Sequence, residues 1–192
     1  FDPASKPPSL WQAPHADLER SPAIEFHSLS KTYNMTGWRL GYLAAPAPIA
    51  KAAAKIQSQF TSAPCSISQK AGVAALQMDK KPVRAMVSAF RQRRDYVLAR
   101  LRGLDGVRCP EPQGAFYLYP DVSATFGRTT PEGQAIESSD DLCMYLLEAH
   151  HVATVPGTAF GAPNGLRLSY ASSMETLKTA LQRIDDGLAA LR

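Results

Sequence analysis

The sequence has few of the residues and patterns that mark secreted, metal-binding and membrane proteins. Its 192 residues include three cysteines, Cys65, Cys109 and Cys143, and no two of them are spaced as Cys-x-x-Cys. An odd number at wide spacing argues against a disulfide framework or a zinc site and favours free thiols in a reducing cytoplasm. No apolar run approaches the roughly 20 residues of a membrane-spanning helix. We therefore expect a cytoplasmic protein with no metal site and no membrane partner.

The N-terminus lacks two common features. Phe1-Asp2-Pro3 contains no initiator methionine, and no charged segment followed by an apolar one marks a secretory signal. We therefore expect the chain to be part of a longer protein. Hydrophobic residues make up 45% of it and charged residues 20%, which is typical of a globular protein. The length suffices for one domain, or two small ones, with a sizeable core.

The net charge is +4, and a basic protein can have an anionic partner. The arginines, however, cluster between Arg84 and Arg102, where they alternate with a periodic apolar stripe. This pattern is typical of the solvated face of a helix, and no nucleic-acid-binding motif accompanies it. We expect no nucleic-acid partner.

Residues that can carry chemistry gather in one short stretch between two apolar segments. From Ser28 to Arg39 it contains Ser28, Ser30, Lys31 and Arg39. A lysine amine can form a Schiff base with an aldehyde. Hydroxyl donors and a planar guanidinium fork suit a phosphate group. An aldehyde and a phosphate on one ligand describe pyridoxal phosphate, a cofactor that enzymes bind through a lysine.

The segment SLSKTYNMTGWRLGY resembles the lysine motif of the class I/II aminotransferases, which are fold-type-I pyridoxal-phosphate enzymes. The resemblance implies that Lys31 forms the Schiff base with pyridoxal 5'-phosphate, while Ser28, Ser30 and Arg39 hold its phosphate. The alternative, a surface loop with a solvated lysine, is weaker because a match of this length is far more specific than a lone Ser-x-x-Lys. The sequence from Ile24 to Arg39 is especially similar to the corresponding segment of bacterial diaminopimelate aminotransferases.

A second candidate site lies near the C-terminus. Arg167 stands between two leucines in the β-prone second half of 164–170, where an unpaired guanidinium is costly. The segment resembles the R-L-S-[YF] motif of the same family, and residues 155–161 resemble its V-P-G-x-x-F-G loop. The resemblance implies that Arg167 pairs with the α-carboxylate of the substrate, fork to fork. The alternative is an arginine on an edge strand, facing water.

Hydrophobic periodicity and turn residues predict the elements around these motifs. The patterns indicate strands over 23–27, 40–45, 107–109 and 115–119, helices over 49–60, 66–78, 82–102 and 140–150, and a closing helix after Ser172. Capping-box spacing places helix starts at Ser66 and Ser172. The two strands that flank the lysine stretch suit a mostly parallel sheet. In the helix over 140–150 we expect four residues to face inward: Leu142, Cys143, Leu146 and Leu147.

The resemblance implies an α/β fold, namely the C-terminal part of a fold-type-I large domain plus an α+β small domain. Residues 1–81 would end the large cofactor-binding domain, 82–104 would form a connecting helix, and 105–192 the small domain. Several family features that precede the lysine have no match here. They are the glycine-containing phosphate loop, the aromatic that stacks on the cofactor ring, the asparagine, and the aspartate that pairs with the pyridine nitrogen, with its nearby tyrosine. Asp2 lies too close to the start of the chain to take the aspartate's role.

The function that the resemblance implies is transfer of an amino group between an amino acid and a 2-oxo acid, by a longer chain that forms a homodimer. The fragment alone is expected to be inactive, since the ring-binding groups are missing. Two alternatives stay open. One is a pyridoxal-phosphate lyase on the same fold, because nothing after Lys31 separates the two reactions. The other is a regulator that keeps an aminotransferase-like domain as a ligand sensor.

Overall fold

The computed structural model describes residues 9–13, 17, 20 and 23–192, and these form two units. One unit lies within residues 3–85 and the other covers residues 86–192, so the division falls inside helix α4 (Lys81–Arg102). Most of the connection expected over residues 1–22, and Asp2 with it, lies outside the described residues. No helix in the described part is long and apolar enough to cross a membrane.

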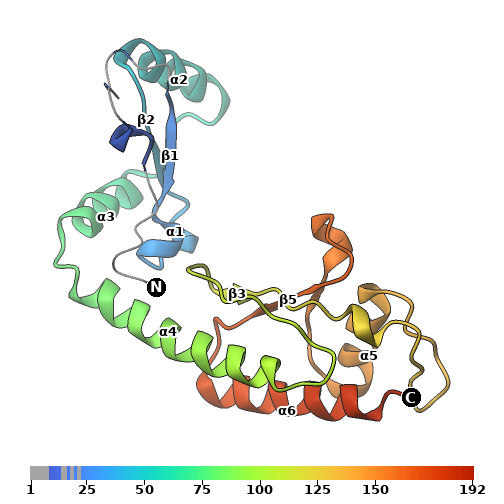
Figure 1. Ribbon diagram of the computed structural model, residues 1–192. Helices are drawn as coiled ribbons and strands as arrows, with labels where there is room; N and C mark the ends of the chain where they lie inside the picture. The colour runs from blue at the N-terminus through green and yellow to red at the C-terminus, as the bar shows by residue number, and fades with distance from the viewer. Residues whose placement is uncertain (1–8, 14–16, 18–19, 21–22) are drawn as a thin grey trace. The chain divides into compact units, whose positions relative to one another are not determined.

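In the unit within residues 3–85, the two strands around the lysine motif pair directly with each other (Figure 1). The elements of this unit are η1 (Leu10–Gln12), β1 (Glu25–Ser28), α1 (Leu29–Thr32), η2 (Thr36–Trp38), β2 (Gly41–Ala44), α2 (Ala47–Phe60) and α3 (Ser66–Gln77). Strands β1 and β2 are antiparallel, so the expected parallel arrangement is wrong for this pair. The chain turns back within residues 29–40, and so short a return leads to antiparallel pairing because parallel strands need a longer crossover.

Helix α3 packs against the lysine motif through a small apolar cluster of Leu29, Met35 and Ala75. Gly72 allows this approach, since a Cβ atom at this position would lie 2.5 Å from Cδ2 of Leu40. The predicted capping box is wrong. Cys65 is the N-cap of α3, and the Gln69 side chain donates to the Pro64 carbonyl at 2.8 Å.

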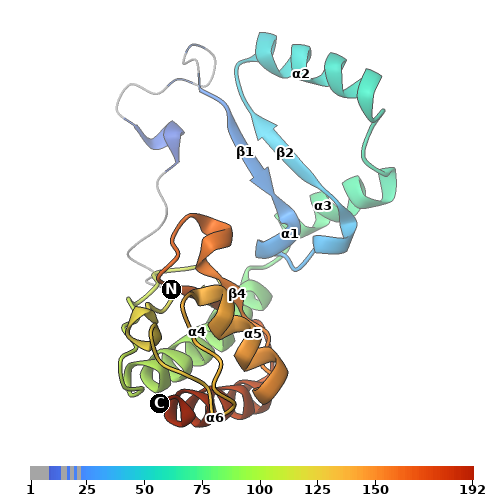
Figure 2. The same ribbon diagram turned by 90° about the vertical axis from the view of Figure 1, so that its right-hand side faces the viewer.

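The unit of residues 86–192 packs its helices and a three-stranded sheet around one core (Figure 2). Its further elements are β3 (Tyr117–Leu118), η3 (Ser123–Thr125), α5 (Ser139–His150), β4 (Val155–Pro156), η4 (Gly157–Phe160), β5 (Leu166–Ser169) and α6 (Met174–Ala190). The strand order is β3-β5-β4, and both pairings are antiparallel. Helices α4 and α6 lie side by side, joined by an Arg100–Asp185 ion pair at 3.3 Å.

Two local predictions for this unit need correction. The strand expected over 107–109 forms only one bridge, between Arg108 and Asp121. The capping serine of α6 is Ser173 rather than Ser172, and its hydroxyl accepts from the Thr176 N–H at 3.0 Å. A one-residue shift of this kind arises because either serine offers the same hydroxyl, and only the backbone turn decides between them.

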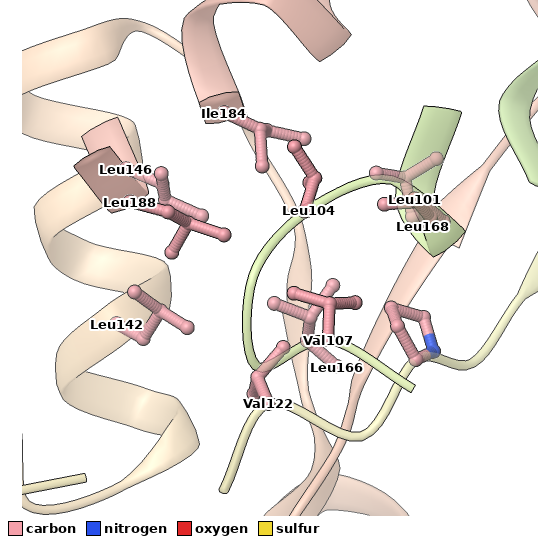
Figure 3. A pocket seen from close by; sticks show the side chains of 11 residues that line it. Leu101, Leu104, Val107, Val122, Leu142, Leu146, Leu166, Leu168, Ile184 and Leu188 are labelled. Atoms are coloured by element: carbon pink, nitrogen blue, oxygen red, sulfur yellow. The ribbon is translucent and has the colours of Figure 1, made fainter. Parts of the chain in front are cut away.

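A small cavity lies in the core of this unit (Figure 3). Its volume is about 10 Å³, at the lower limit for one water molecule, which would also need polar partners. The lining is entirely apolar, so the cavity is a packing feature and not a ligand site. The residues around it are Leu101, Leu104, Val107, Pro120, Val122, Leu142, Leu146, Leu166, Leu168, Ile184 and Leu188.

Helix α5 offers a matched test of this core. Leu142 is 0% exposed beside the cavity, whereas Leu147 is 44% exposed, contrary to the expectation that it faces inward. Leu142→Ala should lower the free energy of unfolding by about 2–5 kcal/mol, since it removes buried contacts and enlarges the cavity. Leu147→Ala should cost only about 0.5 kcal/mol. Urea unfolding of both variants checks this, and equal costs would contradict the assignment of the core face.

Asp121 joins two segments of the same unit and predicts a pH dependence. Its carboxylate accepts from the hydroxyl and N–H of Ser123, at 2.7 and 2.9 Å, and from Arg108 at 3.3 Å. The Ser123 donors, and to a lesser extent Arg108, hold the pKa of Asp121 below its usual 3.8. The carboxylate therefore stabilises the fold above pH 3.8, and this contribution is lost as the pH falls through the lower pKa of the folded state.

Asp121→Asn should therefore lower the free energy of unfolding at pH 7, and the difference from the wild type should shrink as the pH falls below 3.8. Urea unfolding at a series of pH values measures the difference. Ser123→Ala should reduce the same pH dependence, because it removes the hydroxyl that contributes most to the lowered pKa. A difference that stays constant with pH would contradict this role of the Asp121 charge.

Candidate functional site

Lys31 lies in the short helix α1, which begins directly where strand β1 ends. Ser28 is both the last residue of β1 and the N-cap of α1, and its Oγ accepts from the Ser30 N–H at 3.1 Å. Leu29 is 3% exposed and fixes the start of the helix in the apolar cluster beneath it. Lys31 itself is exposed. The capped turn thus presents Ser28, Ser30 and Lys31 from one rigid support.

Arg39 is tied back to this turn through Thr36. The Thr36 hydroxyl donates to the Ser30 carbonyl at 3.2 Å, and Nη1 of Arg39 donates to the Thr36 carbonyl at 3.0 Å. The backbone of Arg39 is left-handed, with φ 50° and ψ 46°, which is uncommon outside glycine and is found often at functional sites. Ser28, Ser30, Lys31 and Arg39 therefore lie on one loop that these hydrogen bonds hold together.

The donors of this loop fit a phosphate group. In the part of the chain that the structure describes, Arg39 has no carboxylate partner and the Ser30 hydroxyl has no hydrogen-bond partner. The Ser28 hydroxyl accepts one bond and donates none within that part. A guanidinium and two hydroxyls that can still donate are the chemistry that a phosphate dianion requires. The residues present therefore match the phosphate of pyridoxal 5'-phosphate.

A contact distant in sequence supports the lysine turn. The Lys80 amine donates to the Tyr33 hydroxyl at 3.0 Å and to the Leu76 carbonyl at 3.1 Å, and it lies 5.1 Å from the centre of the Tyr33 ring. Tyr33 is the C-cap of α1. The contact therefore joins the end of the lysine helix to the end of α3. No local pattern indicates it, because the two residues are 47 positions apart.

Arg167 lies on β5, the central strand of the sheet in the other unit. The alternative of an arginine on an edge strand is therefore wrong. Its guanidinium lies over two aromatic rings, 4.8 Å from the centre of Phe160 and 5.5 Å from that of Tyr117. Tyr117 comes from β3 and Phe160 from η4, the turn that follows β4. Both aromatics are partly exposed beside the arginine.

No carboxylate within the described residues pairs with Arg167, and no hydrogen bond there uses its N–H donors. The side chain is nevertheless half-buried. Aromatic faces stabilise a guanidinium through its charge but leave the donors along its edge available. The arrangement can therefore accept a carboxylate from a ligand, as a planar fork binds two oxygens at once.

Comparison with known proteins gives a consistent set of matches. The family model described as aminotransferase class I and II matches residues 3–184. An aspartate aminotransferase from Pinus pinaster is 45% identical over 188 residues, which is 96% of this chain and 36% of that protein. An aspartate aminotransferase from Rhizobium meliloti (strain 1021) is 46% identical over 161 residues, which is 84% of this chain and 39% of that protein.

Solved structures give the same result. The crystal structure of the aspartate aminotransferase from Rhizobium meliloti aligns with a TM-score of 0.85 at 44% identity, covering 88% of this chain and 42% of that one. The aspartate aminotransferase from Thermotoga maritima aligns with a TM-score of 0.74 at 38% identity, covering 86% and 40%. The similarity confirms the mixed α/β, fold-type-I architecture, of which this chain represents a part.

The comparisons also correct one prediction. The Pinus pinaster and Rhizobium meliloti relatives are named aspartate aminotransferases, so the similarity to diaminopimelate aminotransferases that the lysine motif indicated is not supported. The chain spans about 40% of the length of these relatives. The family model, by contrast, covers nearly all of the chain. The chain belongs to the class I and II aminotransferases, a family of enzymes that depend on pyridoxal phosphate.

Proposed function

We propose that this chain is the lysine-bearing part of an aminotransferase that exchanges an amino group between aspartate and a 2-oxo acid. The observation that carries the proposal is the lysine loop, which holds Lys31, two serine hydroxyls and an arginine that has no carboxylate partner among the described residues. The choice of aspartate is supported by the names of the Pinus pinaster and Rhizobium meliloti relatives. Aspartate therefore replaces diaminopimelate, the substrate that the sequence of the lysine motif favours.

Each residue of the lysine loop has a distinct role in this proposal. Ser28, Ser30 and Arg39 hold the phosphate of pyridoxal 5'-phosphate, two as neutral donors and one as a charged fork. The Nζ atom of Lys31 is the covalent attachment point. When bound, the cofactor supplies an electron sink for negative charge at the α-carbon of the substrate. The Lys31 amine, released when the amino group of the substrate takes its place, would act as the general base that removes the proton from that carbon.

Arg167 orients the substrate in this proposal. Its guanidinium binds the α-carboxylate through two parallel hydrogen bonds, which fixes both the position and the plane of that group. A fixed carboxylate limits the directions in which the α-carbon can present its C–H bond, and such orientation is a large part of catalysis. The rings of Phe160 and Tyr117 hold the guanidinium in place without using its donors.

The complete enzyme needs more polypeptide than this chain supplies. We propose that it is longer, because this chain spans about 40% of the length of its relatives, and that it acts as a cytoplasmic homodimer. The groups that would stack on the cofactor ring and pair with its nitrogen come from the remaining part. Free thiols at Cys65, Cys109 and Cys143 are compatible with the cytoplasm.

Chemical labelling tests the role of Lys31. We expect pyridoxal phosphate followed by borohydride to label Lys31 in the complete enzyme, since reduction makes the lysine–cofactor bond permanent. Lys31→Arg should abolish saturable labelling, while Lys51→Arg, a matched change on α2, should leave it intact. Peptide mapping by mass spectrometry locates the label. Saturable labelling of another lysine would contradict the assignment.

The chain alone should not catalyse transamination. Residues 1–192 should convert aspartate and 2-oxoglutarate no faster than free pyridoxal phosphate does, because the ring-binding groups are supplied elsewhere. Activity should return when the remaining part of the Rhizobium meliloti enzyme is supplied as a second chain. The same mixture with Lys31→Ala is the control and should stay inactive. Turnover by the 192 residues alone would show that they contain the whole site.

A further inference from the structure

The turn that carries Phe160 is attached to the first two residues of helix α5. The Gly157 N–H donates to Oγ of Ser139 at 3.2 Å, and the Thr158 hydroxyl donates to Oδ2 of Asp140 at 2.7 Å. Ser139 is 0% exposed and Gly157 is buried, whereas Asp140 and Thr158 are exposed. Two consecutive residues of η4 thus bond to two consecutive residues of α5. We call these four residues the α5 latch.

The same turn is also held from its other side. The Tyr119 hydroxyl donates to the Ala162 carbonyl at 2.8 Å, and its ring meets the Phe160 ring edge to face at 6.3 Å. A side chain at Gly157 would collide with the carbonyl oxygens of Ala162 and Gly165, so the backbone there is closely packed. The position of Phe160 is therefore fixed by the latch on one side and by Tyr119 on the other.

Phe160 lies against Arg167, so the position of its ring affects the guanidinium. Its ring lies 4.8 Å from the guanidinium, yet 48% of the side chain is exposed, so apolar burial alone does not fix it there. The bonds of the latch supply the missing restraint. A binding group keeps its affinity only when its supporting residues hold it close to the productive geometry.

We propose that Thr158 and Asp140, with Ser139, are positioning residues that hold Phe160 against Arg167 and so keep its guanidinium aligned for a carboxylate ligand. The inference rests on the proposed role of Arg167 in carboxylate binding. Loss of the latch lets the η4 turn and Phe160 move, and the guanidinium then samples orientations that do not bind two oxygens. The affinity for carboxylates falls as a result, while the lysine loop, which belongs to the other unit, keeps its own contacts.

Thr158 is the best position for a test, because it is exposed and its change leaves the buried Ser139 bond in place. Thr158→Val keeps the branched shape but removes the hydroxyl, and Thr158→Ser keeps the donor. Thr179→Val is a matched control, since among the described residues the Thr179 hydroxyl bonds only to the Glu175 carbonyl, within α6. The variants are made in the 192-residue chain labelled with ¹⁵N-arginine, and the Nε–H signal of Arg167 is identified by its loss in Arg167→Lys.

Succinate is the probe, and the signal of Arg167 is followed both without it and during titration. Thr158→Val should shift the ligand-free signal, because the ring of Phe160 moves, and should raise the dissociation constant about three- to ten-fold, the effect of one lost hydrogen bond. Thr158→Ser and Thr179→Val should stay within about two-fold of the wild type, well below that effect.

The outcomes separate this inference from the proposed function. An unchanged ligand-free signal together with an unchanged succinate affinity in Thr158→Val would overturn the proposed positioning role of the α5 latch. If the Arg167 signal of the wild type does not change when succinate is added, the role of Arg167 as a carboxylate site is overturned. In that case the ligand-free signal still tests whether the α5 latch positions Phe160 against Arg167. A shift of that signal in Thr158→Val supports this role, and the absence of a shift overturns it.

Discussion

The pairing of Ser28 with Gly41 closes the loop that carries every candidate cofactor residue. A Cβ atom at Gly41 would lie 2.6 Å from the His27 carbonyl oxygen, so the two strands can meet at this point only because residue 41 is glycine. Once the base is closed, the left-handed backbone at Arg39 directs its side chain back toward the lysine turn, where it bonds to Thr36. The chemistry of the loop thus depends on a backbone contact made by a residue with no side chain.

Arginines in the described part of the chain differ in how their charge is balanced. Arg94, Arg100 and Arg108 pair with carboxylates of the chain, and their positions are explained by packing. Arg39 and Arg167 have no such partner in the part that the structure describes, yet their donors are held in place by a backbone carbonyl and by aromatic rings respectively. Arg93 and Arg102 are held in the same two ways, by the Phe90 ring and by the Cys109 carbonyl, so the lack of a carboxylate partner does not by itself mark a ligand site. A half-buried guanidinium such as Arg167 is stabilised when an anion pairs with it, and under the proposed function the substrate carboxylate supplies that anion.

Local patterns in the sequence predicted most helices, because these depend on neighbours along the chain, whereas the residues of both candidate sites stay predictions. The local patterns failed where a contact joins distant segments. The antiparallel pairing of β1 with β2, the Lys80–Tyr33 bond and the central position of Arg167 in its sheet all depend on tertiary packing. Capping boxes failed for a related reason, since spacing alone does not fix the backbone angle of the capping residue. Local structure was therefore more predictable than contacts between distant segments.

The two units differ in how well they bury their own apolar residues, and this bears on what the chain needs in order to function. The unit of residues 86–192 encloses a continuous core to which α4, α5, α6, β3 and β5 all contribute. In the described part of residues 3–85 the buried hydrophobic cluster is limited to Leu29, Met35 and Ala75, while Phe26 and Phe60 are 79% and 82% exposed. Apolar surface of that kind stabilises a fold only when it is covered, at about 25 cal/mol per Å². The lysine loop is built on the unit that leaves this surface open. Polypeptide that covers it would therefore stabilise the loop and, under the proposed function, supply the missing groups around the cofactor ring.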